Sequence, residues 1–136
     1  MQPSELPLAA AWLGADGEPV AALRRCGDDR VGPLSLRDLS GTAGWRTSED
    51  HESGSTTFPL PSPPRAWRAG TRGPQCFRPD RSYLLKAYGG QDGLSSYTIV
   101  LTLTSADLTA LRPGQVWAGG RAMSLGEFEE LAEDSC

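Results

Sequence analysis

The sequence has few of the residues that most often carry catalysis or bind metal ions. Its 136 residues include a single histidine, His51, and three cysteines, Cys26, Cys76 and Cys136. None of them shows the paired Cys/His spacing of a zinc site. The acidic residues beside His51 lack the alternating oxygen ligands and the central glycine of a calcium loop. We therefore expect no metal and no cofactor.

Local signatures of enzymes are also absent. The segment GGQDG lacks the Gly-Lys-Ser/Thr ending of a phosphate loop, and neither a Gly-x-Ser-x-Gly elbow nor a Ser-x-x-Lys pair occurs. Catalysis by a Cys-His pair would require the polar loop of His51 to fold over a thiol. We expect a protein that is not an enzyme. The alternative is a small enzyme or metal-dependent catalyst that uses His51 with Cys76 or nearby carboxylates.

Long apolar runs and clustered positive charge are missing as well. No segment approaches the roughly 20 apolar residues of a spanning helix, so we predict no membrane span and a soluble chain. The net charge is -4 and the arginines are scattered, whereas nucleic acid binding needs a clustered positive surface. We therefore expect no nucleic acid partner. The first residues lack the basic start of a signal peptide. We expect a cytoplasmic location as written, or an extracytoplasmic one if a leader has been removed.

Glycine and proline are frequent, and the apolar segments between them are short. The chain has 16 glycines and 11 prolines, and its length fits one domain with one core, residues 1–136. Asp16-Gly17 is a hairpin signal between residues 7–13 and 20–26, and GGQDGL joins residues 81–88 to residues 95–104 in the same way. These patterns predict a mainly antiparallel β-sandwich of about seven short strands.

Weaker patterns predict the remaining strands. We expect one within residues 31–39 and a final short one at residues 115–119. The middle, residues 40–80, is irregular and rich in loops. Because a long structureless loop is unusual in a compact domain, we expect short strands there around Trp45 and at residues 56–60.

The acidic C-terminal segment has the pattern of a short amphipathic helix. Ser124 and Glu127 fit a capping box at its start. Its apolar residues recur at helical spacing: Leu125, Phe128, Leu131 and Ala132. Such a helix is too short to be stable alone, so we expect Phe128 to dock on the sheet. One functional alternative follows, an apolar small-ligand pocket under the helix, lined by Phe128 and Ile99.

Three cysteines leave one over after any pairing. A disulfide between Cys26 and Cys136 would tie the first hairpin to the C-terminal helix and close a loop of about 110 residues, worth about 4 to 5 kcal/mol at best. Cys76 would then be the remaining thiol. The alternative is that all three are reduced in a cytoplasmic protein.

One aromatic residue in the middle of the chain is a candidate for contact with a partner. Trp67 lies in PSPPRAWRAG between Arg65 and Arg68. It is either an exposed anchor supported by cation–π contact or a cover for a sheet edge. We expect a binding or accessory module that recognises a protein partner through the surface between Trp45 and Phe77.

The order of segments carries a family resemblance. VAALRRCGDDRV, then SYLLKAYG, an alternating strand and LRPGQVWAGGRAMSLGEFEELA with a terminal cysteine resemble small actinobacterial β-sandwich proteins of uncharacterised function, many of them exported. The likeness is strongest from Tyr83 to Cys136 and around Cys26. It implies an immunoglobulin-like or related sandwich in which Cys26 and Cys136 are brought together, and it implies no activity.

Overall fold

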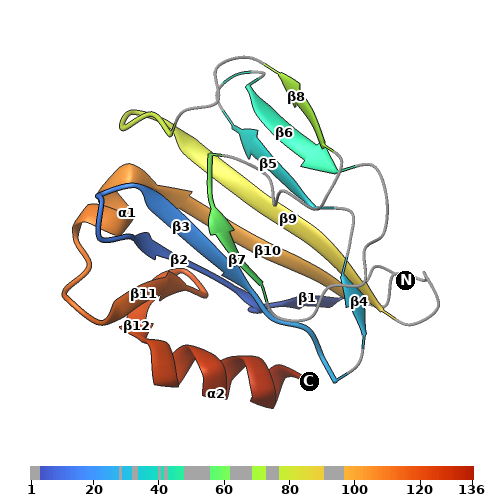
Figure 1. Ribbon diagram of the computed structural model, residues 1–136. Coiled ribbons are helices and arrows are strands. Elements are labelled where there is room, and N and C mark those ends of the chain that lie inside the picture. Colours follow the sequence, from blue (N-terminus) through green and yellow to red (C-terminus); the bar gives the residue numbers. More distant parts are fainter. Residues whose placement is uncertain are drawn as a thin grey trace.

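The computed structural model describes residues 4–27, 29–31, 34–39, 41, 43–47, 56–61, 69–72, 77–90 and 97–136. In these residues two β-sheets pack face to face, and a C-terminal helix covers the outer face of the smaller sheet (Figure 1). The elements are β1 (Ser4–Leu6), β2 (Ala9–Leu13), β3 (Pro19–Leu23), β4 (Arg30–Val31), β5 (Ser35–Asp38), β6 (Gly44–Thr47), β7 (Thr56–Pro59), β8 (Ala69–Arg72), β9 (Ser82–Gly90), β10 (Tyr97–Thr104), α1 (Ser105–Thr109), β11 (Gln115–Ala118), β12 (Arg121–Ser124) and α2 (Leu125–Ser135). The mainly β architecture predicted from the sequence is confirmed.

The larger sheet has seven strands, in the order β1-β10-β9-β5-β6-β8 with β4 also paired to β9. Its centre is the antiparallel pair of β9 and β10, which the glycine-rich hairpin signal predicts correctly. The apolar face of β10 points into the molecule because side chains alternate along a strand. Ile99, Leu101 and Leu103 on that face are at most 2% exposed.

The smaller sheet has five strands, in the order β12-β11-β2-β3-β7. The hairpin of β2 and β3 turns at Gly17, whose φ of 82° explains the Asp-Gly signal. β2 is buried on both faces, since Ala9 and Ala11 face the larger sheet while Ala10 faces α2. Small side chains there allow the sheet to act as the middle layer between the larger sheet and the helix.

The prediction of about seven strands was too low. The two sheets together hold seven and five strands in the part of the chain that the structure describes. β4 has two residues and β1 has three, while β8 and β12 have four each. Strands this short hardly show the alternation by which a sequence reveals them. The helix α1, whose start at Thr104 is fixed by a capping box with Asp107, was missed for the same reason of length.

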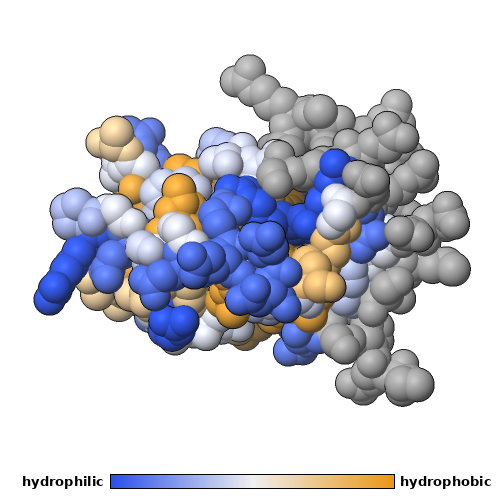
Figure 2. Space-filling model, turned by 90° about the horizontal axis from the view of Figure 1, so that it is seen from below, coloured by the Kyte–Doolittle hydropathy of each residue, from blue (hydrophilic) through white to orange (hydrophobic). Residues whose placement is uncertain are grey.

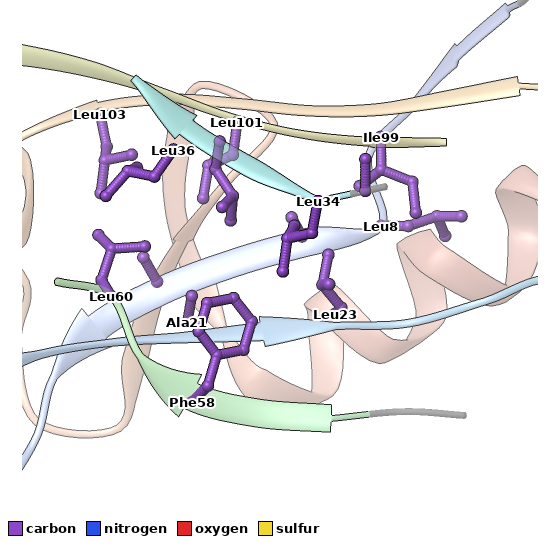
Figure 3. Packing of buried hydrophobic residues seen from close by; sticks show 14 of the residues in the cluster. Leu8, Ala21, Leu23, Leu34, Leu36, Phe58, Leu60, Ile99, Leu101 and Leu103 are labelled. Atoms are coloured by element: carbon purple, nitrogen blue, oxygen red, sulfur yellow. The ribbon is translucent and has the colours of Figure 1, made fainter. Parts of the chain in front are cut away.

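The core is divided by the smaller sheet. The main cluster lies between the sheets, where Leu101, Leu103 and Ile99 meet Leu23, Phe58 and Leu60 (Figure 3). A second cluster lies on the outer face of the smaller sheet, where Phe128 is fully buried against Val116, Ala118 and Met123. The expected docking of Phe128 is thus confirmed. Phe128 and Ile99 do not line one pocket, as the small-ligand alternative expected, because they belong to separate buried clusters with the smaller sheet between them.

The C-terminal end of α2 is fastened to the end of β3. The Cα atoms of Cys26 and Cys136 are 5.3 Å apart, and their sulfur atoms are bonded. About two turns earlier in the helix, the guanidinium of Arg24 donates to both carboxylate oxygens of Glu129, with the shortest N–O distance at 2.6 Å. Arg24 also lies over the ring of Phe128, 5.8 Å from its centroid. We call Arg24, Cys26, Glu129 and Cys136 the C-terminal latch.

Tyr97 holds the loop that carries Cys26. Its hydroxyl accepts a hydrogen bond from the backbone N–H of Cys26 at 3.2 Å and donates one to Asp29 at 2.9 Å. Burial, as the largest cause, raises the pKa of Tyr97, so the phenol stays protonated and keeps donating to Asp29. Gly89 lies directly against the tyrosine ring and leaves no space for a Cβ. The latch is therefore built on a fixed loop.

Within the described ranges, neither helix has the length and apolar character to cross a membrane.

Candidate functional site

Most residues singled out from the sequence lie outside the described residues. These are His51, Cys76, Arg65, Trp67 and Arg68. The Cys-His alternative and the Trp67 surface therefore stay predictions. Among the residues that are described, no group of three or more His, Cys, Asp or Glu side chains is placed to hold a metal ion.

The two ends of the predicted partner surface are described, and both are packed. Trp45 is 3% exposed and its indole N–H donates to the carbonyl of Leu60. Phe77 stacks on Tyr83 with 4.4 Å between ring centroids. Trp45 is thus part of the core, whereas Phe77 packs against the core and is only partly buried.

The structure instead presents an apolar groove at one end of the sandwich. Its volume is about 510 Å³, and it lies where the end of β2, the segment from α1 to β11 and the start of α2 come together. The lining includes Trp12 and Leu13 from β2, Leu111, Arg112 and Pro113 from the loop after α1, and Leu125 from α2. Leu108 and Val116, both buried, also line it. We call this the α1–β11 groove.

The groove carries exposed leucines. Leu13 is 38% exposed and Leu125 is 46% exposed, and both line the groove. The third exposed leucine of the described residues, Leu39 at 44%, follows β5 on the larger sheet and does not line it. The sequence assigned Leu125 to the buried stripe of α2, which was wrong. Fully burying an exposed leucine is worth about 1.5 to 3 kcal/mol, and covering the part of these two that is still exposed is worth a fraction of that, so this end of the molecule favours an apolar occupant.

A tight turn holds one wall of the groove. Gln115 donates its backbone N–H to the carbonyl of Arg112 at 3.0 Å, and its side-chain oxygen accepts from the N–H of Arg112 at 2.9 Å. Between them stand Pro113 and Gly114, and Gly114 has a φ of 84°. Proline followed by a glycine at positive φ is the pattern of a type II turn. This wall is therefore formed before any ligand arrives.

The opposite wall is fixed by the cap of α2. The backbone N–H of Ser124 donates to the carboxylate of Glu127, whose own N–H donates to the serine hydroxyl. The hydrogen bond from the Ser124 backbone is the main cause that lowers the pKa of Glu127. Leu125 is the first residue of the helix, so the capping box sets its position. The capping box itself was predicted correctly.

One charged side chain lines the groove. Arg112 is exposed, and no carboxylate belongs to the lining. Among the residues that the structure describes, Arg112 has no ion-pair partner. The carboxylates of Glu127 and Asp107 accept hydrogen bonds at the two helix starts. The lining of the groove is mainly apolar, with one positively charged side chain.

A smaller pocket of about 300 Å³ lies between the β11–β12 turn and the edge of the larger sheet. It is lined by Glu5, Leu6, Pro7, Val100, Leu101, Thr102, Gly119 and Gly120. Leu101 is buried there, and the indole of Trp117 already donates to the carbonyl of Thr102. It offers no exposed large apolar side chain, so we consider the α1–β11 groove the better candidate site.

Sequence reasoning missed the groove because its walls come from three separated segments. Residues 12–13, 108–116 and 125 meet only once the sheets and helices have formed. The one local signal was Leu125, which directly follows the capping Ser124 and is the first residue of the helix. Comparisons of the chain with protein-family models, curated proteins and solved structures give no match.

Proposed function

We propose that this protein is a non-enzymatic binding module that recognises a protein partner through the α1–β11 groove. The observation that carries the proposal is the pair of exposed leucines, Leu13 and Leu125, on the walls of a preformed groove. Interface energy concentrates where an anchor side chain fills such a pocket. A groove whose walls are already held by a turn and a helix cap loses little entropy on binding.

The openness of the site favours a protein over a small apolar ligand. Small-molecule pockets bury most of their ligand, typically about 70 to 90% of its surface. Here two leucines on the rim stay exposed beside the groove, and a partner backbone running across it would cover both of them. A volume of about 510 Å³ is within the range of ligand pockets, so a small apolar ligand is the second candidate.

The other sequence-based expectations remain proposals beside this one. Trp67, with Arg65 and Arg68, is a candidate second contact for the same partner, and His51 with Cys76 is the enzymatic alternative. The resemblance to small actinobacterial sandwich proteins, many of them exported, and the disulfide both fit a protein that works outside the cytoplasm. An immunoglobulin-like type of sandwich is the least supported of these, since that fold has seven to nine strands.

Selection of random peptides displayed on phage tests the proposed function. Peptides that are selected on the wild-type protein and bind in the groove should bind Leu13→Ser and Leu125→Ser at least about tenfold more weakly, because each change removes an apolar wall. Leu39→Ser is the matched control, since Leu39 is equally exposed but far from the groove lining. It should bind the peptides as the wild type does.

Two results would contradict this function. Selected peptides that bind the Leu13→Ser and Leu125→Ser variants with wild-type affinity would show that the groove is not the binding surface. Failure of repeated selections to enrich any peptide would show that no peptide-binding surface is present. Equal melting temperatures of the three variants and the wild type establish that lost binding does not reflect lost folding.

A further inference from the structure

We propose that the α1–β11 groove selects a partner segment in which an apolar anchor side chain lies next to a carboxylate, and that Arg112 is the residue that recognises the carboxylate. This inference rests on the proposed function and names the chemistry of the partner. It is carried by the coincidence of two features at one place, the apolar lining and Arg112, the one charged side chain of that lining, which has no ion-pair partner among the described residues.

The apolar features of the groove define the anchor. Leu13, Leu111, Pro113 and Leu125 line the groove, together with the buried Leu108 and Val116. None of these six side chains has a polar group. A leucine, phenylalanine or similar side chain placed between the walls would gain apolar contact on both sides without leaving a polar group unsatisfied.

Arg112 differs from the arginines that serve the fold. Arg24 makes a two-pronged pair with Glu129 at 2.6 to 3.2 Å, and Arg81 lies 3.8 Å from Asp38. Arg112 has no such partner among the described residues, although its backbone is fixed by the turn to Gln115. The planar guanidinium matches a carboxylate with two parallel hydrogen bonds. Apolar neighbours strengthen this pairing because they keep water away from one side of it.

The net charge of the protein does not decide the partner at this site. The chain carries -4, and the exposed face of α2 is acidic, with Glu130, Glu133 and Asp134. Figure 2 shows the face that includes α2, hydrophilic at its centre with hydrophobic residues at its sides. Charges farther than about 8 Å apart are largely screened at physiological ionic strength. The local cation therefore outweighs the distant acidic face for a group that binds inside the groove.

Three probes that share one apolar body test the selectivity. Phenylbutyrate, phenylbutyramide and phenylbutylamine carry a negative, a neutral and a positive head, and each is titrated into the full protein while amide NMR signals are followed. The shifted signals should belong to groove residues such as Leu13, Leu111, Gly114 and Leu125. The butyrate should bind about threefold to fivefold more tightly than the amide, the gain expected of an exposed ion pair, and the amine should bind most weakly.

Matched variants separate the two parts of the site. Arg112→Gln should bring the affinity for the butyrate down to that for the amide and leave the amide unchanged. Leu125→Ser should weaken all three probes. Arg37→Gln is the control, because Arg37 is an exposed arginine on β5 and does not line the groove, so it should change nothing.

The outcomes distinguish this inference from the proposed function. Equal affinity of the three probes, or tighter binding of the amine, would overturn the carboxylate selectivity while groove binding stands. No shift at groove residues with any probe would overturn both. Dodecanoate and hexanoate test the source of the carboxylate: binding that tightens about fourfold with each added methylene would identify a lipid chain, and nearly equal binding is expected for a protein segment.

Discussion

The two ends of helix α2 differ in how their chemical groups are used. At the C-terminal latch, Arg24 is paired with Glu129, Cys136 is bonded to Cys26 and the nearby Phe128 is fully buried. At the other end, Leu125 is 46% exposed, and Arg112 beside it in the groove has no ion-pair partner among the described residues. The same helix therefore has one closed end and one open end.

The difference shows how a rigid site is kept on a small domain. The residues of the latch are bonded to one another, as an ion pair and a disulfide. That end of the helix therefore contributes stability and has no group left to bind a ligand. In the groove, the hydrogen bonds of the turn at Gln115 and of the cap at Ser124 fix the backbone, and the apolar side chains stay available for contact. Exposed leucines are tolerated there because the closed end already anchors the helix that carries one of them.

The largest expected effect contrasts Phe128 with Leu125. Phe128→Ala should lower the free energy of unfolding by about 3 to 5 kcal/mol, because it empties the cluster between α2 and the smaller sheet. Leu125→Ala should change it by less than about 0.5 kcal/mol, since Leu125 is half exposed. Denaturant unfolding measures both. Similar losses for the two variants would show that Leu125 is part of the core and not a free wall of a groove.

The second effect concerns the disulfide of the latch. Peptide mapping without reductant should recover a linked peptide containing Cys26 and Cys136, and Cys76→Ser should leave that peptide in place. The double change Cys26→Ser and Cys136→Ser should cost about 2 to 4 kcal/mol, because the loop it opens spans 110 residues. Recovery of three free thiols from protein produced under oxidising conditions would contradict the closed end. Helix content should survive the change, as Phe128 remains buried.

The sequence predicts the parts of this fold that depend on local patterns. The predictions of the Asp16-Gly17 hairpin, the alternation of β10 and the capping box at Ser124 were correct. Each of these features depends only on residues that are close together in the sequence. A disulfide between Cys26 and Cys136 was one of two alternatives from the sequence, and the family resemblance implied that these cysteines meet; the structure brings them together. Strands of two to four residues were not predicted, because pairing with neighbouring strands stabilises them and their own sequence is too short to show an alternating pattern.

The candidate site could not be predicted in the same way. Leu125 shares a face of α2 with Phe128 and Ala132 and so was assigned to the core, but it is the first residue of the helix and is 46% exposed, whereas the other two are buried. Whether the first turn of the helix is covered depends on what packs beside it, here Trp12 and the loop after α1. That information lies in tertiary structure. The sequence also gave no reason to separate Arg112 from the other arginines.

The smallest expected effect compares the paired arginine of the latch with the unpaired arginine of the groove. Arg24→Gln should lower the free energy of unfolding by about 0.2 to 1 kcal/mol, the range for a partly exposed ion pair, with a further small loss of its contact with Phe128. Glu129→Gln should cost a similar amount, and the double variant should cost less than the sum because both changes break the same pair.

Arg112→Gln is the corresponding change in the groove, to be compared with Arg24→Gln in the latch. It should leave the free energy of unfolding unchanged within about 0.5 kcal/mol, because Arg112 makes no ion pair in the described structure. The backbone hydrogen bonds of its turn are retained in the variant, so the groove keeps its shape. A loss as large as that of Arg24→Gln would mean that Arg112 stabilises the fold, and the contrast between a closed and an open end of α2 would not hold.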